Sequence, residues 1–181
     1  NRPVGRTNAD GSYTVKPEVD SDEITNYEFG WKTISKDGQL RFNGSAFMVD
    51  VAGLQSTIFD PSIVNLFFSD NAANATIKGV EGDFTYYTNV EGLSVAGAFS
   101  ILNTNIDDAL VPTNDVVVGT DLAFAPGNQG NIRVRKETGM SGGNVGHVQV
   151  QYTFSDSSFS DIMGPNKAEQ DSYSYIDLRA G

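Results

Sequence analysis

The sequence predicts an all-β chain in which about seven antiparallel strands follow one another up and down. Apolar and polar residues alternate with a period of two, as in a strand with one apolar face. Short turns and long connections alternate between these runs, and no stretch has the pattern of a convincing helix. Nineteen glycines, with abundant Asn, Ser, Asp and Thr, favour a chain with many turns.

The first predicted element is a β-hairpin from Asn26 to Asp50. Tyr27, Phe29 and Trp31 share one face of its first arm. The turn from Lys36 to Gln39 contains an Asp-Gly pair, which supplies the positive φ that a tight hairpin needs. The return arm places these residues on its apolar side: Leu40, Phe42, Gly44, Ala46 and Met48.

The chain then continues as further alternating runs, each of which predicts one strand. These runs are Val80 to Tyr87, Leu93 to Ile101, Asn131 to Arg135, Val148 to Ser155 and Tyr173 to Ala180. The polar segment from Asn1 to Asp22 is predicted to be a long loop.

The connections between the predicted strands alternate in length. The short ones are Lys36 to Gln39, Thr88 to Gly92 and Gly139 to Asn144. The long ones are Gln55 to Asn74, Asn103 to Pro126 and Asp156 to Asp171. Short turns at one rim and long loops at the other are typical of an up-and-down outer-membrane barrel. Greek-key connections in a sandwich are not expected to keep this regularity.

The polar face of the predicted strands carries many charged side chains. They are Glu28, Lys32, Arg41, Glu81, Asp83, Arg133, Arg135, Asp177 and Arg179. A water-filled lumen accepts such residues, whereas a sandwich core would not. A sandwich whose polar face is its solvent face explains the alternation equally well, so both architectures stay open on the residues alone.

Aromatic residues fall near several predicted strand ends, where a barrel places its interfacial girdles. They are Trp31, Tyr86, Tyr87, Tyr152, Phe154, Tyr173 and Tyr175. In a soluble sheet, the same residues would serve as ordinary aromatic packing.

Composition excludes several classes of function. The formal charge is −11, from 23 acidic and 12 basic residues, and phosphate binding needs clustered Lys and Arg, so nucleic acid is not an expected partner. Cysteine is absent, which removes disulfides, thiol nucleophiles and thiolate metal sites. No run approaches the roughly 18 to 20 apolar residues of a membrane helix.

Three patterns could carry chemistry, and each has a simpler explanation. The single His147 has no acidic or nucleophilic partner at ligand spacing. The oxygen donors from Asn103 to Asp108 resemble a calcium loop, but the glycine at its sixth position and the glutamate at its twelfth are missing. Glu81 and Asp83 are carboxylates on one face with nothing to position a substrate between them. We therefore expect no catalytic, cofactor or metal site and no enzymatic activity.

Four segments together resemble the later barrel strands of TonB-dependent outer-membrane receptors. They are DEITNYEFGWKTISKDGQLRFNGSAFMVDVAGLQ (22–55), ATIKGVEGDFTYYTNVEGLSVAGAFSILNTNI (75–106), GTDLAFAPGNQGNIRVR (119–135) and DSYSYIDLRAG (171–181). Each is weak alone. Four in the correct order, with matching turn and loop lengths, are fairly specific.

The resemblance implies a location in the outer membrane of a Gram-negative bacterium and a role in transport. Members of that family enclose an amino-terminal plug within a barrel of 22 strands. An energy-coupling inner-membrane protein drives their uptake of scarce nutrients such as iron chelates (siderophore uptake), cobalamin or saccharides. The expected partners are outer-membrane lipid, such a nutrient ligand, and the TonB-type coupler acting through the plug.

The sequence departs from the family pattern by omission. We find no plug, no coupling segment and no closing strand with a terminal aromatic residue, so residues 1–181 are expected to be one partial barrel without a second domain. They would be an internal piece of a receptor, either a truncated chain or the ordered part of a longer one. The ligand-binding residues cannot be assigned from the sequence. The alternative is a secreted or surface all-β binding module, a sandwich or jelly roll whose acidic loops bind glycan or calcium.

Overall fold

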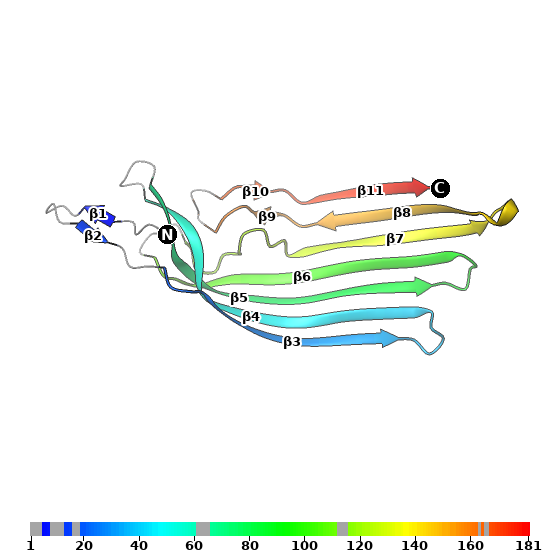
Figure 1. Cartoon of the computed structure of the whole chain (residues 1–181), viewed down its shortest axis with the longest axis horizontal. Helices are drawn as coiled ribbons and strands as arrows, with labels where there is room; N and C mark the ends of the chain where they lie inside the picture. The colour runs from blue at the N-terminus through cyan, green and yellow to red at the C-terminus, as the bar shows by residue number, and fades with distance from the viewer. Residues whose placement is uncertain are drawn as a thin grey trace.

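The main feature of the computed structural model is one antiparallel sheet of seven strands (Figure 1). The structure describes residues 5–7, 13–15, 19–60, 66–111, 116–162, 164 and 167–181. In spatial order the strands are β3 (Glu23–Ile34), β4 (Leu40–Asp60), β5 (Leu66–Tyr87), β6 (Leu93–Ala109), β7 (Asn128–Gly139), β8 (Val145–Ser155) and β11 (Tyr173–Ala180). The predicted all-β, up-and-down arrangement is confirmed. Within the described residues, the outer edges of β3 and β11 pair with no further strand.

Two small sheets accompany the large one. β1 (Gly5–Thr7) pairs with β2 (Tyr13–Val15), so the prediction of a loop from Asn1 to Asp22 is wrong at these residues. β9 (Ser158–Phe159) pairs with β10 (Glu169–Gln170) inside the third long connection. No second large sheet stacks on the first within the described part of the chain, as the alternative of a sandwich would require.

The three predicted short turns all lie at one end of the sheet, the turn end (Figure 1). In the first turn, Gly38 has a φ of 72°, as the Asp-Gly pair predicts. The Gly38 amide donates to the Ser35 carbonyl at 2.8 Å, and the Ser35 amide donates to the Leu40 carbonyl at 2.8 Å. The third turn contains a 3-10 turn, η1 (Ser141–Gly143). The long connections gather at the opposite end, the loop end.

Two of the long connections are shorter than the sequence predicts, because the strands run on into them. β4 and β5 stay paired from Gln55 with Asn71 to Asp60 with Leu66, and β6 continues to Ala109. Loss of strict alternation in these segments suggested loops. Backbone pairing does not depend on that alternation, so the ladder persists after the pattern ends.

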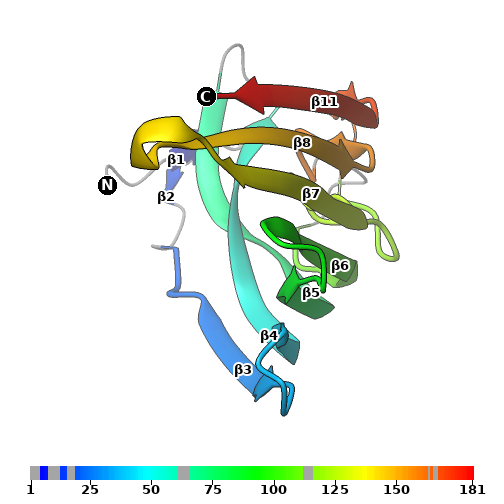
Figure 2. The same ribbon diagram turned by 90° about the vertical axis from the view of Figure 1, so that its right-hand side faces the viewer.

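The paired extension of β4 and β5 bends where its register shifts, between Val51 and Gln55. Gly53 has a φ of 69° in this bulge, and its amide donates to Asn74 Oδ1 at 2.9 Å. Asn71 Nδ2 donates to the Gly53 carbonyl at 2.6 Å and to the Asp20 carbonyl at 2.9 Å. A bulge of this kind bends its strand. Figure 2 shows the sheet as a curved wall, with the extension crossing its concave side at the loop end.

A small apolar core forms at the loop end, against the bent extension. Its buried members are Ala72, Ala73, Ile106, Val111, Val116 and Ile162, and Leu54, Leu122 and Ala123 pack on them. The rest of the sheet has no core of its own, since both of its faces are largely open. Within the described residues, no helix is long and apolar enough to cross a membrane.

Candidate functional site

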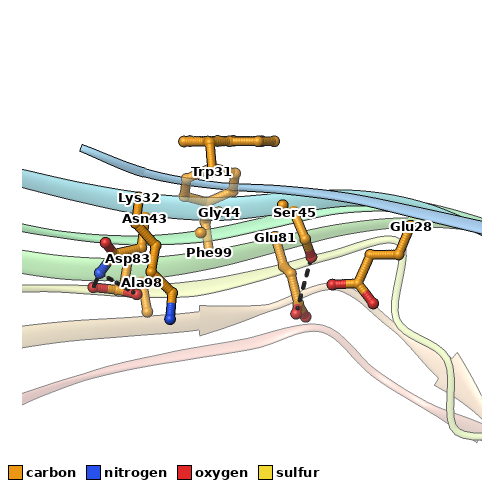
Figure 3. Close-up of a pocket in the computed structure, with 12 residues that line it drawn as sticks. Glu28, Trp31, Lys32, Asn43, Gly44, Ser45, Glu81, Asp83, Ala98 and Phe99 are labelled. Atoms are coloured by element: carbon orange, nitrogen blue, oxygen red, sulfur yellow. Dashed lines mark hydrogen bonds between the residues drawn. The ribbon is translucent and has the colours of Figure 1, made fainter.

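The concave face of the sheet is a polar wall. Strand register places all nine charged residues predicted for the polar face on this one face. Figure 3 shows Glu28, Lys32, Asn43, Glu81 and Asp83 on the side toward which the remaining strands curve, opposite Trp31. They line a groove of about 650 Å³.

Cross-strand contacts hold some of these side chains in place. Lys32, Asn43 and Asp83 are direct neighbours across β3, β4 and β5. Asn43 Nδ2 donates to the Asp83 carboxylate at 3.2 Å, and Ser45 Oγ donates to Glu81 Oε1 at 3.4 Å. These cross-strand pairs hold the two carboxylates in position on the polar wall. They place no nucleophile or base around a common reacting position.

Arginines collect on the same face toward the turn end. Arg135 Nε and Glu137 Oε1 form an ion pair at 2.9 Å, and Arg135 Nη1 donates to Gln149 Oε1 at 3.4 Å. Arg133 and Arg179 have no ion-pair partner within the described residues. Unpaired guanidinium groups need contact with water, so this part of the wall faces an aqueous space.

The convex face is a continuous apolar band. One row across the sheet contains Phe42, Phe84, Gly97, Ile132, Tyr152 and Ile176. The next row toward the turn end contains Leu40, Tyr86, Val95, Val134, Val150 and Leu178. Leu178 is 75% exposed and Ile176 is 65% exposed. A band of apolar residues that crosses β4 to β11 on one face of a sheet is typical of the surface that a barrel presents to lipid.

Flat aromatic rings fill the band where glycines leave space. Trp31, Gly44, Gly82 and Phe99 are successive neighbours across β3 to β6. A Cβ added at Gly44 would lie 2.4 Å from Trp31 Cζ2, so the indole occupies the place of a side chain. The rings thus occupy space that the glycines leave open, and Figure 3 shows Trp31 on the side of the sheet opposite Glu81 and Asp83.

The predicted aromatic girdle is only partly right. Tyr86, Tyr152, Phe154 and Trp31 lie on the convex face with the apolar rows. The prediction is wrong for three residues, because Tyr87, Tyr173 and Tyr175 share the concave face with the charged residues. Their position near a strand end does not decide the face, since the face depends on parity along the strand.

The polarity of the two faces reverses near the loop end. On the convex face, Asp50, Thr76 and Asn105 form a polar row, and Thr76 Oγ1 donates to Asp107. On the concave face, the adjacent row of Val51, Ala75 and Ile106 is buried to 8%, 2% and 0% exposure. The outward row is thus no longer part of the apolar band, and Ile106 of the inward row belongs to the loop-end core.

A cleft of about 380 Å³ opens beside that core, between the bent β4 extension and two connections. Leu54, Leu122 and Ile162 form its apolar part, with the hydroxyls of Ser56, Thr57 and Ser160 around them. Sequence reasoning missed this cleft because its residues come from three distant segments. The available signal was the isolated apolar residues within otherwise polar connections.

Phe124 follows the cleft residue Ala123 and stands out by its backbone. Its φ is 54°, and its side chain is 73% exposed. Its amide donates to the Phe159 carbonyl at 2.7 Å. A bulky residue at positive φ is rare and is held there by its surroundings.

The structure does not bring the residues considered for metal binding into one site. His147 lies on β8 opposite Glu137, and its backbone pairs with Gly181. The structure shows Asn103 to Asp108 as part of strand β6, so they cannot form the loop that calcium ligation of that type requires. Asn114, at the twelfth position of that pattern, lies outside the described residues. Within the described residues, no three His, Asp or Glu side chains are placed to hold a metal ion.

Comparisons with known proteins agree with this geometry. Residues 2–181 match the family described as TonB dependent receptor-like, beta-barrel. Among curated proteins, none matches the sequence. The ferric yersiniabactin uptake receptor FyuA from Yersinia pestis superimposes with a TM-score of 0.66 at 15% identity, over 93% of this chain and 24% of that one.

Two other solved structures are similar to the same extent. The siderophore receptor PiuA from Acinetobacter baumannii gives a TM-score of 0.65 at 15% identity, over 90% of this chain and 22% of that one. The ferric citrate transporter FecA in its unliganded form gives 0.64 at 15% identity, over 87% and 23%. At this identity the likeness shows the fold. The chain spans about a quarter of the length of the receptors that it matches.

An antiparallel sheet with an apolar convex face and a charged concave face is typical of one class of protein, the membrane β-barrels. Within that class, the chain belongs to the TonB-dependent receptor β-barrel family, whose members are transport receptors rather than enzymes. These are outer-membrane proteins of Gram-negative bacteria, which gives this chain its location.

Proposed function

We propose that this chain is part of the wall and outer rim of a receptor that takes up a scarce nutrient across the outer membrane. The observation that carries the proposal is the division of one sheet into an apolar convex face and a charged concave face, in a chain whose family match covers residues 2–181. The wall separates lipid from an aqueous lumen, and the loop end is the side that a ligand meets first.

An iron chelate is the proposed nutrient. The structures that resemble this chain include receptors described by ferric yersiniabactin uptake, as a siderophore receptor and as a ferric citrate transporter. Cobalamin and saccharides, which other members of the family take up, are alternatives that the uptake measurement below separates from iron.

The proposed partners follow from the two faces and from the family. Outer-membrane lipid covers the convex face, and a plug fills the lumen and connects the receptor to a TonB-type energy coupler. Residues 1–181 act as a single partial barrel without a second domain. We propose no catalytic, cofactor or metal role for any residue. The alternative of a secreted sandwich or jelly roll has no observation in its favour, since the described strands form one large sheet rather than a stacked pair.

The test is uptake by intact cells. A strain that lacks the receptor, and the same strain complemented with it, are grown under iron limitation and supplied with radioactive ferric chelates, cobalamin or a labelled oligosaccharide. Receptor-dependent and TonB-dependent accumulation of iron supports the proposal. Accumulation of cobalamin or saccharide alone contradicts iron as the nutrient, and no receptor-dependent accumulation of any of them contradicts the transport role.

A further inference from the structure

The charge of the loop end restricts what can approach it. In residues 50–76, 103–127 and 156–172, which make up the loop-end parts of the strands and the long connections, every charged residue except Lys167 is acidic. The Lys167 ammonium lies 3.6 Å from the centre of the Phe159 ring, so it is engaged with that ring. A surface with one sign of charge attracts the opposite sign and repels its own over a distance of about 8 Å at physiological salt.

The cleft at this end has a lining that fits a ligand without negative charge. Its apolar part is Leu54, Leu122 and Ile162, of which Ile162 is 8% exposed. Ser56 and Thr57 have hydroxyls that make no hydrogen bond within the described residues. Among the described residues, no Lys or Arg lines the cleft, although recognition of carboxylate or catecholate oxygens calls for such cations. Free hydroxyls beside an apolar floor suit amide, hydroxamate or hydroxyl groups.

Phe124 is an exposed aromatic residue in the connection that supplies Leu122 and Ala123 to the cleft. The residue is adjacent in sequence to the lining residue Ala123, and the hydrogen bond to Phe159 fixes its strained backbone. The Phe124 ring is 73% exposed, so most of its apolar surface is not buried by the protein. A ligand that covered the ring would therefore be stabilised by burial of that surface. Strained residues of this kind cluster at binding sites.

We propose that the cleft beside the loop-end core binds a neutral or cationic ferric chelate, that Phe124 packs on it, and that the acidic connections disfavour anionic chelates. This inference rests on the proposed uptake function and adds the charge class of the ligand and its contact residue. It sets this receptor apart from one for a ferric polycarboxylate, whose negative charge the loop end would repel.

The experiment uses the complete receptor in outer-membrane vesicles and two forms of one chelate. The first is a ferric trihydroxamate with a free ammonium group, of net charge +1. The second is the same chelate with that amine succinylated, of net charge −1. At low salt we expect the cationic form to bind about tenfold or more tightly, and we expect the difference to shrink at high salt. Equal or tighter binding of the anionic form would overturn the inference.

Substitution separates the cleft from the general field of the loops. Phe124→Ala should weaken both forms by about tenfold, as loss of a buried aromatic contact does. Val118→Ala is the matched control, because Val118 is 56% exposed in the same connection and does not line the cleft, and it should leave both affinities unchanged. Equal effects of the two variants on affinity would show that Phe124 does not contact the chelate.

The outcomes also distinguish this inference from the function on which it rests. Receptor-dependent iron uptake with a preference for the succinylated chelate would refute the charge class alone. If neither form bound and the receptor made no difference to iron accumulation, the proposed function would fall, and the inference with it.

Discussion

The two ends of the sheet place their apolar residues on opposite faces. Toward the turn end, apolar rows such as that of Ile132 face outward and arginines face inward. Toward the loop end, Ile106 faces inward at 0% exposure while Asp50 faces outward. This reversal is typical of a strand that passes from a bilayer into water, and at the loop end the connections supply the apolar core.

The largest effect is expected from a substitution that empties the loop-end core. Ile106→Ala removes a fully buried side chain and should lower the local free energy of unfolding by about 2–5 kcal/mol. Hydrogen exchange of the amides near the loop end of β6 would measure it. The neighbouring Asn105→Ala, on the outward face, should cost less than about 1 kcal/mol. Similar losses for both would show that the loop end has no inward core.

The next largest effect is expected from a charge placed in the apolar band of the convex face. Ile132→Arg should destabilise the barrel in a bilayer by about 2–4 kcal/mol, because its row lies within the apolar band. Asn131→Arg is the matched control on the concave face of the same strand and should cost less than about 1 kcal/mol. Denaturant unfolding of the receptor in lipid vesicles measures both. Equal penalties would mean that the convex face does not meet lipid.

Much of the turn-end half could be predicted from the sequence, because a single pattern decides it. Tyr27, Phe29 and Trp31 alternate with polar residues, and Asp37 and Gly38 define the turn. Since a strand has a period of two, these local facts fix both the hairpin and its faces. The predicted strands and the nine charges on one face are confirmed for this reason.

The loop-end half could not be predicted in the same way, because its environment comes from distant segments. Asp50 has the same parity as Phe42, so the alternation alone gives no sign that the outside has changed from lipid to water. The burial of Ile106 depends on Val116 and Ile162, which belong to other connections. The cleft and the strained backbone of Phe124 depend on the same tertiary packing.

The third prediction concerns the bend that joins the two halves. Asn71→Ala removes the side chain that bonds the Gly53 carbonyl and both backbone groups of Asp20. Leaving such groups unpaired should cost about 1–3 kcal/mol and loosen the β4–β5 extension. Faster proteolysis within residues 54–73 would report this. Asn71→Asp keeps the acceptor for the Asp20 amide and loses both donors, so its effect should be intermediate. An unchanged cleavage rate in both variants would show that the bulge is held by other contacts.

The smallest effect is expected in the turn between β3 and β4, where no core and no bilayer contributes. The Ser35 hydroxyl, and then the Gln39 amide at 3.0 Å, donate to the Asp37 carboxylate and hold its pKa below its ordinary value. The folded state therefore favours the ionised form, and this contribution is present above the ordinary Asp pKa of about 4. This contribution is lost as the pH falls through the lower pKa that Asp37 has in the folded state.

Asp37→Asn should therefore be slightly less stable than the wild type at neutral pH, and the two should converge in acid. Denaturant unfolding in bilayers from neutral pH to about pH 3 would follow the difference. Glu91→Gln is the control in the neighbouring turn, because the Glu91 carboxylate makes no hydrogen bond within the described residues. If the difference in free energy of unfolding between Asp37→Asn and the wild type widened in acid, the result would contradict a depressed pKa at Asp37. In that case the Ser35 and Gln39 bonds would not favour the ionised form, and the turn would depend on its glycine alone.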